Sequence, residues 1–352
     1  PRRAPWAMLR ALGAAALRRP ALRTATSPVA TLRPEEPIAH AIAVMSERGV
    51  GSILVAAHSG AIQGILTERD VLEKLDFNAS LHSVSIESLM TREMAMQRAQ
   101  PDSSMGFCLE KMQVGGFRHI PIMDGTVALA MLSMRDVGKV LCLEHAAVAH
   151  GSHGAADCQP AEETAALAAA TAVTASDLSA SRATRVHVGQ LAMPSCIEVP
   201  RASTVAEAVV RMREWRAGAV LVPARDGDMS ASRDRFSIFT ERDYLNMLGS
   251  AARLGVSLDP RRVAITACAT PSSSVVGVTP NTAAISCLQK MVDDGVRQLP
   301  VIAPVATTPA GSTSGAHASA VADADATDSP RGMLVAMLTM RDVLAHFLPG
   351  SG

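Results

Sequence analysis

The chain has 352 residues, of which 48% are hydrophobic, and its 33 basic side chains balance 33 acidic ones. The formal net charge of zero and the lack of a basic run argue against a general attraction to nucleic acid or to an anionic membrane. No stretch reaches the roughly 18 to 20 consecutive apolar residues that span a bilayer, and the six Cys form no CxxC pair. We therefore expect about two domains with substantial cores, no membrane insertion, no disulfide framework and no zinc knuckle.

The first residues differ in composition from the rest. Residues 1–34 contain seven Arg and no acidic side chain, around an Ala- and Leu-rich stretch. A basic segment of this kind is typical of an organelle transit peptide. We predict a disordered transit peptide over residues 1–30 and a mitochondrial location, with plastid and cytoplasm as alternatives.

A pattern of four elements then occurs four times. Apolar residues at helical spacing end at Met45, Met112, Met212 and Met291, and the fourth to tenth positions after them read GVGSILV, GFRHIPI, RAGAVLV and GVRQLPV. The β-branched tails of these segments predict buried strands. A second apolar strand runs into a polar tetrad and another helix, in the segments GILTERDVLEKL, AMLSMRDVGKVL, SIFTERDYLNML and AMLTMRDVLAHF. Each unit is predicted as helix, strand, strand, helix.

The repeats predict the domain organisation. We place the units at residues 31–79, 83–143, 185–250 and 262–349, with a low-complexity linker at 144–184. A tract of small and polar residues at 303–330 is expected to be a disordered insertion within the fourth unit. The first and third units share TERD and the second and fourth share MLxMRD, so the units form two pairs.

This order resembles the cystathionine-β-synthase (CBS) domain family, whose units pair into Bateman modules. The resemblance rests on FRHIPIMDGTVALAMLSMRD, on GVRQLPVI with MLTMRD, on the two TERD copies and on the connector IESLMT. It covers most of residues 31–143 and 185–348, and the layout is similar to that of stand-alone CBS-only or CBS-pair proteins of plants, algae and fungi. It implies an α/β (α+β) fold of four units, with small mixed sheets and helices packed on one face. It also implies two modules that stack within the chain or in a homodimer.

The tetrads allow two interpretations. A Thr or Ser at a strand-to-helix junction, followed three residues later by an acid, forms a capping box. A cap requires neither the Arg nor the Asp that occur in every tetrad. An adenine nucleotide would use these groups, because Asp can accept hydrogen bonds from ribose hydroxyls, while a hydroxyl, helix amides and guanidinium can bind phosphate.

The family resemblance implies the candidate site. It assigns ribose to four carboxylates, and places four hydroxyls beside ribose or phosphate: Asp70, Asp136, Asp243 and Asp342; Thr67, Ser133, Thr240 and Thr339. It assigns phosphate contacts to Arg69, Arg135, Arg242 and Arg341 of the tetrads, and to Arg118, His119 and Arg297 on the opposing strands. The base would approach the backbone at Gly51, Ser52, Gly218 and Ala219.

Two features of this site stay open. His119 is alternatively a satisfied histidine at a strand edge. The glycine that the family usually has three residues before the hydroxyl occurs as Gly64 alone, and Ala130, Ser237 and Ala336 replace it elsewhere. These side chains are expected to narrow their pockets, so the clefts should differ in occupancy.

The function we expect is that of a non-enzymatic regulatory protein. It would bind AMP, ADP, ATP, NAD or S-adenosylmethionine in the module clefts and transmit the ligand state to an unidentified partner protein. The alternative is a scaffolding CBS protein with degenerate clefts that acts by protein–protein interaction, and an enzyme with an unrecognised activity is a third hypothesis. We expect no catalytic residue, no cofactor besides the regulatory nucleotide and no metal; the His145, His150, His153 and Cys158 group is more typical of solvated linker side chains.

Overall fold

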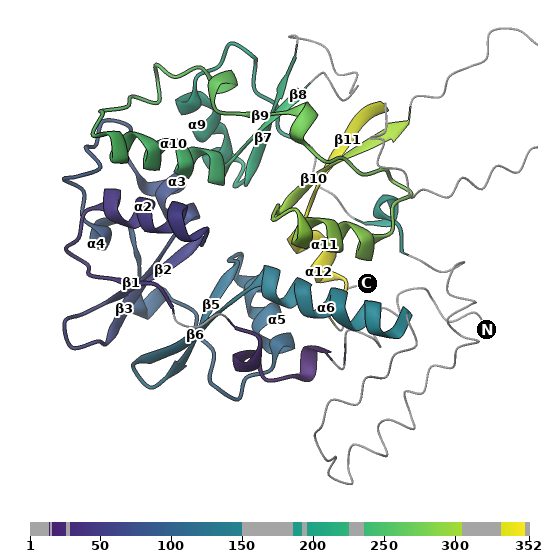
Figure 1. Cartoon of the computed structure of the whole chain (residues 1–352), viewed down its shortest axis with the longest axis horizontal. Helices are drawn as coiled ribbons and strands as arrows, with labels where there is room; N and C mark the ends of the chain where they lie inside the picture. Colours follow the sequence, from purple (N-terminus) through teal and green to yellow (C-terminus); the bar gives the residue numbers. More distant parts are fainter. Residues whose placement is uncertain are drawn as a thin grey trace, which may run out of the picture.

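The computed structural model describes residues 14, 16–25, 29–149, 186–191, 196–224, 236–304 and 332–348. Its main elements follow the predicted order of helix, strand, strand and helix in four successive units (Figure 1). The first module holds α2 (Ile38–Arg48), β2 (Ser52–Ala56), β3 (Ile62–Thr67) and α3 (Glu68–Lys74), then α5 (Met105–Gly115), β5 (His119–Asp124), β6 (Val127–Ser133) and α6 (Met134–Ala149). The second module holds α9 (Val205–Glu214), β7 (Ala219–Pro223), β8 (Phe236–Thr240) and α10 (Glu241–Leu254), then α11 (Ala284–Asp293), β10 (Gln298–Pro304), β11 (Gly332–Thr339) and α12 (Met340–Ala345).

Each unit is built on an antiparallel hairpin of its two long strands. In the first unit, β1 (Thr31–Leu32) pairs parallel with β2, and β4 (Thr91–Arg92) pairs antiparallel with β3. In the third unit, β9 (Thr270–Pro271) extends the hairpin on one side. The sheets are therefore small, and the first is mixed, as predicted.

Short helical segments complete the units. They are η1 (Ala21–Arg23), α4 (Ile86–Leu89), η2 (Glu93–Ala95), η4 (Val188–Gln190), η5 (Ile265–Ala267) and η6 (Ser272–Ser274). The segment that precedes each module docks on that module's second unit, since Pro20 pairs with Ser104 and His187 with Ala283. The connector between the two units docks back on the first one, through Pro37 with Ser85 and Thr204 with Ala264.

The docking of residues before the first module on its second unit corrects the interpretation of the N-terminal segment. Residues 1–30 were expected to be disordered, but Ala16, Leu17 and Ala21 are buried in the core of the second unit. The amide of Ala21 donates to the carbonyl of Ser103 at 2.8 Å. The apolar residues of this segment therefore serve the fold, while residues 1–13 lie outside the described part.

The predicted unit boundaries shift for related reasons. The connector helix α4, which we assigned to the second unit, packs with the first, and η5 packs with the third unit rather than the fourth. The predicted linker begins too early, because α6 continues to Ala149. The insertion begins too early as well, since β10 runs to Pro304. The remaining linker and insertion residues, 150–185 and 305–331, lie outside the described residues.

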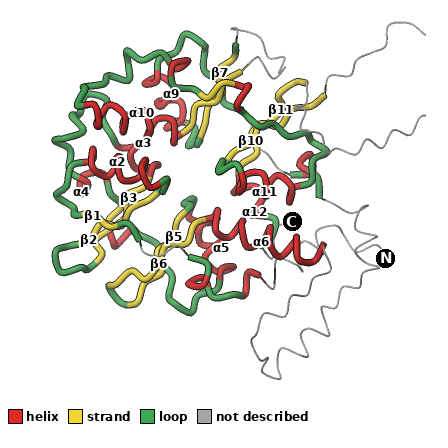
Figure 2. The backbone as a smooth tube through the Cα atoms, viewed as in Figure 1, coloured by secondary structure: helices red, strands yellow, loops and turns green. Residues whose placement is uncertain are grey.

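Two kinds of core hold the units together. Within each module, the sheets face each other across small apolar clusters, one around Leu54, Ile65 and Met131 and one around Leu221 and Met337. Between modules, the helices form larger cores that join the first unit to the third and the second to the fourth. Figures 1 and 2 show the result as a ring in which the units follow the order first, second, fourth, third. The two modules thus stack within one chain.

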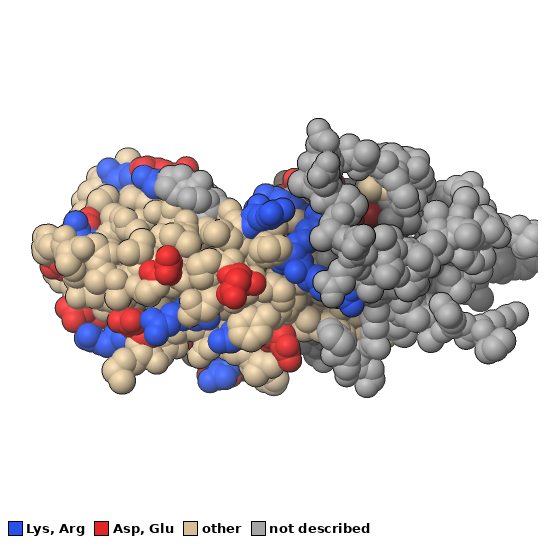
Figure 3. All heavy atoms as spheres, turned by 90° about the horizontal axis from the view of Figure 1, so that it is seen from below, with Lys and Arg blue, Asp and Glu red and all other residues tan. Residues whose placement is uncertain are grey.

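On the face seen in Figure 3, acidic and basic side chains are interspersed over most of the described part, and a group of basic side chains lies beside the residues drawn in grey. Among the described helices, none combines the length and apolarity needed to cross a bilayer. The described residues also hold no group of three His, Cys, Asp or Glu suited to a metal ion, and His150, His153 and Cys158 lie outside them.

Candidate functional site

A cavity of about 920 Å³ lies at the centre of the ring, where the four units meet. One part, the first lobe, is lined by Ala30, Gly51 and Ser52 of the first unit and by Ser133 and Asp136 of the second. The equivalent residues of the second module form the second lobe: Ile197, Gly218, Ala219, Thr339 and Asp342. The duplicated sequence therefore produces two similar lobes that share one central space.

All four tetrads form capping boxes. The amide of Ser133 donates to Oδ2 of Asp136 at 2.9 Å and the Ser133 hydroxyl donates to the same oxygen at 2.7 Å. The other three boxes, at Thr67, Thr240 and Thr339, have the same geometry within 0.1 Å. The capping interpretation is therefore confirmed at every copy. It leaves the second oxygen of each carboxylate for other partners.

The second carboxylate oxygen distinguishes the four copies. Oδ1 of Asp70 accepts from Lys74 at 2.6 Å and from the Thr91 hydroxyl at 3.0 Å. Asp243 is similarly bonded to the side chain of Thr270. Neither of these carboxylates belongs to the cavity lining, whereas Asp136 and Asp342 do. Burial raises the pKa of Asp342. Two of the four predicted ribose positions thus face the cavity.

The tetrad arginines connect the two modules. Arg69 pairs with Glu241 at 2.9 Å, and Arg242 pairs with Glu68 at 2.5 Å. Arg135 donates to the carbonyl of Gly295, and Arg341 donates to the carbonyl of Gln113. Every one of these contacts crosses from one module to the other. Arg69, Arg135 and Arg341 also line the cavity, but Arg242, Thr67 and Thr240 are not in its lining.

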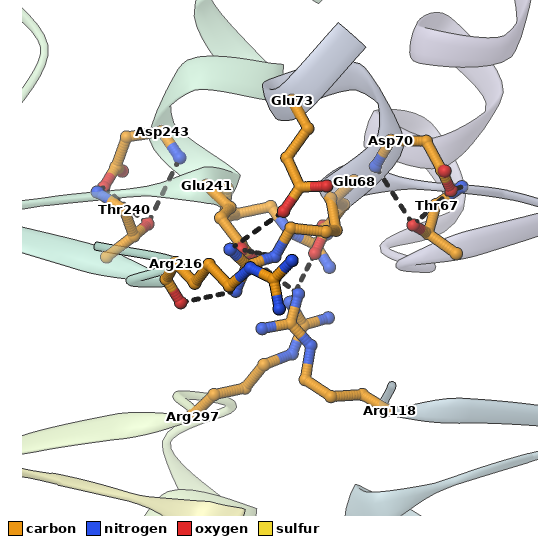
Figure 4. Close-up of polar contacts among 12 residues, drawn as sticks. Thr67, Glu68, Asp70, Glu73, Arg118, Arg216, Thr240, Glu241, Asp243 and Arg297 are labelled. Carbon is orange, nitrogen blue, oxygen red and sulfur yellow. Dashed lines mark hydrogen bonds and ion pairs between the residues drawn. The ribbon is translucent and has the colours of Figure 1, made fainter. Parts of the chain in front are cut away.

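Two buried glutamates, which the sequence analysis missed, organise the centre (Figure 4). Glu68 of the first unit is fully buried and pairs with Arg242 and Arg297 of the second module. Glu241 pairs in the same way with Arg69 and Arg118 of the first module. The sequence does contain a signal for these two glutamates. The second residue of the tetrad is Glu in the first and third units, whereas it is Met134 and Met340 in the second and fourth.

The charge on Glu68 depends on its partners. Burial alone would raise the pKa of its carboxyl, but attraction to Arg297, Arg242 and Arg118 outweighs burial and lowers it. Glu68 is therefore ionised at neutral pH. Figure 4 shows Arg118 and Arg297 rising from the sheets of the second and fourth units toward this pair of glutamates.

The predicted base-facing glycines make room for side chains of the second and fourth units. A Cβ atom on Gly51 would lie 2.7 Å from a guanidinium nitrogen of Arg297 and 2.9 Å from the His119 ring. A Cβ on Gly218 would lie 2.6 Å from the side-chain nitrogen of Gln298. Small residues at these positions therefore bring the side chains of neighbouring units together at the centre.

Gly64 does not shape the cavity. It lies opposite Arg92 of β4, and a Cβ atom there would collide with the backbone carbonyl of Thr91. Neither Gly64 nor its equivalents Ala130, Ser237 and Ala336 belong to the cavity lining. Our expectation that these side chains narrow the pocket is therefore wrong, since the glycine permits a close strand pairing instead.

The cavity carries an excess of positive charge. Seven arginines line it, at positions 69, 118, 135, 211, 216, 297 and 341, against three carboxylates, Asp136, Glu198 and Asp342. Burial raises the pKa of Glu198, which the sequence analysis did not single out. A space with this balance of charge favours an anionic ligand.

His119 contributes no charge of its own at neutral pH. Burial, and then repulsion from Arg297 and Arg118, lowers the pKa of its imidazole to about 3. The side chain lines the cavity as a neutral hydrogen-bonding group. The fourth unit has Gln298 at the equivalent position, which is neutral at any pH.

We expect His119→Gln to reduce the loss of stability on acidification. The folded-state pKa of about 3 lies below the unfolded value near 6.5, so below that pH the unfolded chain binds a proton that the folded chain does not. Wild type should therefore lose on the order of 1 kcal/mol more than the variant between pH 7.5 and 5.5. Urea denaturation at both pH values measures the difference, and parallel pH profiles would contradict the assignment.

Comparisons with known proteins identify a family model and several relatives that are similar to this chain. Residues 22–76 match the family model of the CBS domain. An uncharacterised 17.7 kDa protein of Acidianus ambivalens is 32% identical over 122 residues, which are 34% of this chain and 72% of that protein. The mitochondrial CBS domain-containing protein CBSX3 of Arabidopsis thaliana is 27% identical over 114 residues, covering 32% of this chain and 55% of its own length.

The whole ring has a counterpart among solved structures. MJ1225 of Methanocaldococcus jannaschii, described as a candidate archaeal homologue of g-AMPK, superposes with a TM-score of 0.63 over 94% of this chain and all of its own, at 13% identity. That likeness concerns the fold alone. Together with the four helix–strand–strand–helix units and the match to the family model, these relatives show that the chain belongs to the CBS domain family.

Proposed function

We propose that this chain is a non-enzymatic regulatory protein that binds adenosine-containing nucleotides in the central cavity. The observation that carries the proposal is the combination, in one cavity, of two capped carboxylates, Asp136 and Asp342, with an excess of arginines. A ribose needs a hydrogen-bond acceptor for its hydroxyls, and phosphates need cations and donors. Each lobe offers a carboxylate as the acceptor for ribose hydroxyls, and the shared centre offers guanidinium groups for the phosphates.

The proposed pose follows from this arrangement. Ribose hydroxyls would donate to Asp136 in the first lobe and to Asp342 in the second. The base would lie toward the apolar residues of the same lobes, Met131 and Ala30 or Met337 and Ile197, which also line the cavity. The phosphates would then extend toward Arg118 and Arg297. No covalent step is proposed, so the chain's residues act by binding alone.

Transmission to a partner protein would use the contacts between modules. Arg118 and Arg297 both line the cavity and hold the buried glutamates of the other module. Phosphate would compete with Glu241 and Glu68 for these guanidinium groups. A ligand shifts such an equilibrium only by its differential affinity for two arrangements, and this competition supplies the difference. A partner would read the altered packing of the modules.

A scaffolding role is the second candidate. It is favoured by the four complete capping boxes and by tetrad arginines that bond across the modules, since both explain the tetrads without a ligand. It does not explain why Asp136 and Asp342 face a positively charged cavity. We therefore keep it as the alternative.

A thermal-shift and calorimetric titration tests the proposal. Purified chain would be titrated with AMP, ADP, ATP, NAD and S-adenosylmethionine separately. A bound nucleotide at about 100 times its dissociation constant should add roughly 2.7 kcal/mol to the free energy of unfolding. If none of the five nucleotides stabilises the chain, the proposed regulatory function is wrong and the scaffolding role replaces it. Recovery of unchanged nucleotide by chromatography is expected, and turnover would instead support an enzyme.

Two observations concern the cellular location of the protein. The basic composition of residues 1–34 and the mitochondrial relative CBSX3 favour a mitochondrial location, which we include in the proposal. Imaging of a fluorescent fusion of the full-length natural protein would test it.

A further inference from the structure

The two lobes differ at one position of the backbone. A residue with positive φ follows the main helix within two positions in every unit, and that residue is Gly49, Gly116 and Gly295 in three of them. In the third unit it is Arg216, with φ 49°, which is the sole non-glycine residue with positive φ in the described ranges. A left-handed conformation costs an L-residue roughly 1–2 kcal/mol, so the third unit bears a strain that the others avoid.

The backbone contact at this position does not explain the strain. The carbonyl of Arg216 accepts a hydrogen bond from Arg69 at 3.3 Å. The carbonyl of Gly295 accepts the equivalent bond from Arg135 without any side chain. What distinguishes the third unit is therefore the side chain of Arg216, which belongs to the cavity lining.

The neighbours of Arg216 differ from those of the first lobe as well. Trp215 lines the cavity although 64% of its surface is exposed, and Arg211 lines it one helical turn earlier. The equivalent residues of the first unit are Arg48 and Val44, and neither belongs to the lining. The second lobe thus gains an indole and two guanidinium groups that the first lobe lacks, together with the carboxylate of Glu198, while Arg211 also forms an exposed pair with Glu214 at 3.5 Å.

These additions adjoin the place where phosphates would lie. Arg216 is held beside Arg69 by its own carbonyl, and Arg69 in turn pairs with the central Glu241. Extra cations at this end of the lobe would contact phosphates beyond the first, since guanidinium binds phosphate in a bidentate manner. An indole at the rim would cover these contacts and partly exclude water, which strengthens them.

We infer that Arg211, Trp215 and Arg216 form an additional anion subsite that makes the second lobe selective for nucleotides with two or three phosphates. The inference rests on the proposed function. The first lobe, which has Gly49 at this position, would discriminate less between AMP and ATP. One chain would then hold two sites that respond to different phosphorylation states of the same nucleoside.

Replacement of Arg216 by Gly or by Asn tests the subsite. Gly restores the residue of the other units, and Asn tolerates the left-handed conformation while it lacks the charge. We expect either variant to weaken ADP and ATP binding to one site about 10-fold in calorimetry, which corresponds to one charge-assisted contact. AMP binding should change less than about 2-fold by the same reasoning, because its single phosphate lies with Arg118 and Arg297. The melting temperature without ligand should stay equal or rise, since the strain is relieved.

Two further variants complete the test. Arg48→Ala removes an exposed arginine at the equivalent helix end of the first unit and should leave the ratio of ATP to AMP affinity unchanged. Trp215→Phe should abolish the change in tryptophan fluorescence that ATP produces in the wild type, since Trp6 is the one other tryptophan. An unchanged ATP to AMP ratio in both Arg216 variants would overturn the subsite while nucleotide binding itself stands. Absence of any nucleotide binding by the wild type would overturn the proposed function instead.

Discussion

Replacement of Glu68 by Gln should destabilise the folded chain by about 3–5 kcal/mol, because it removes one partner from a buried ion-pair group. Glu68 is fully buried and neutralises Arg242 and Arg297, which approach it from two different units. Gln keeps the volume of the side chain and removes its charge. The two guanidinium groups would then lie close together without a carboxylate between them. Chemical denaturation at pH 7 measures the loss.

A matched control is available on the same helix. Glu73 forms an exposed pair with Arg69 at 3.5 Å, so Glu73→Gln should cost less than about 1 kcal/mol. The pKa of Glu68 is lowered in the folded chain, so its contribution is present above the unfolded value of about 4.3 and is lost as the pH falls below it. The difference between wild type and variant should shrink accordingly in acid. Equal effects at both glutamates, or a difference that is independent of pH, would show that Glu68 does not hold the modules together.

Replacement of Asp136 or Asp342 by Asn should each remove one bound nucleotide per chain. The proposed carboxylate accepts two ribose hydroxyls, and hydrogen bonds to a charged group contribute roughly 1.5–3 kcal/mol each, so the affinity of the altered lobe should fall at least about 100-fold. Asn retains an oxygen for the capping box, which limits the effect on folding. Calorimetric stoichiometry should drop from two nucleotides to one in either variant and to none in the double variant.

The other two tetrads provide the controls. Asp70 and Asp243 form the same capping box but are not part of the cavity lining. Asp70→Asn and Asp243→Asn should therefore leave nucleotide binding unchanged, although they should cost at least as much stability as the first pair of variants, because Asp70 also pairs with Lys74 and Asp243 with Thr270. If all four variants lose binding equally, the loss reflects the caps, and the assignment of ribose to Asp136 and Asp342 is wrong.

Local patterns of the sequence were enough to predict the four main elements of each unit, but not the short strands and helices between them. Each main helix was visible from the spacing of residues such as Ile38, Ile42 and Met45, and each hairpin from its β-branched strands. The capping boxes were equally local, because the hydroxyl and the carboxylate lie three residues apart. The family resemblance assigned ribose to all four tetrad carboxylates, of which Asp136 and Asp342 line the cavity and Asp70 and Asp243 do not.

Contacts between distant residues could not be predicted in the same way. Glu68 and Arg297 are separated by 229 positions, and their pairing depends on the ring order of the units rather than on any local pattern. The same ring order turns the tetrad arginines toward the other module. The positive φ of Arg216 could not be predicted either, because the neighbouring residues in the sequence do not determine the sign of φ.

The docking of residues 16–25 on the second unit limits where the chain can be cut. Ala16, Leu17 and Ala21 fill part of that unit's core, and Arg19 accepts the amide hydrogen bond of Met105 at 2.9 Å through its carbonyl. A processing protease that removed a leader after Ala30 would therefore strip buried side chains from a unit that begins far downstream. A cleavage that preserves this core must therefore fall before Ala16. The position of the mature N-terminus would thus be limited by the core of the second unit rather than by the start of the first unit.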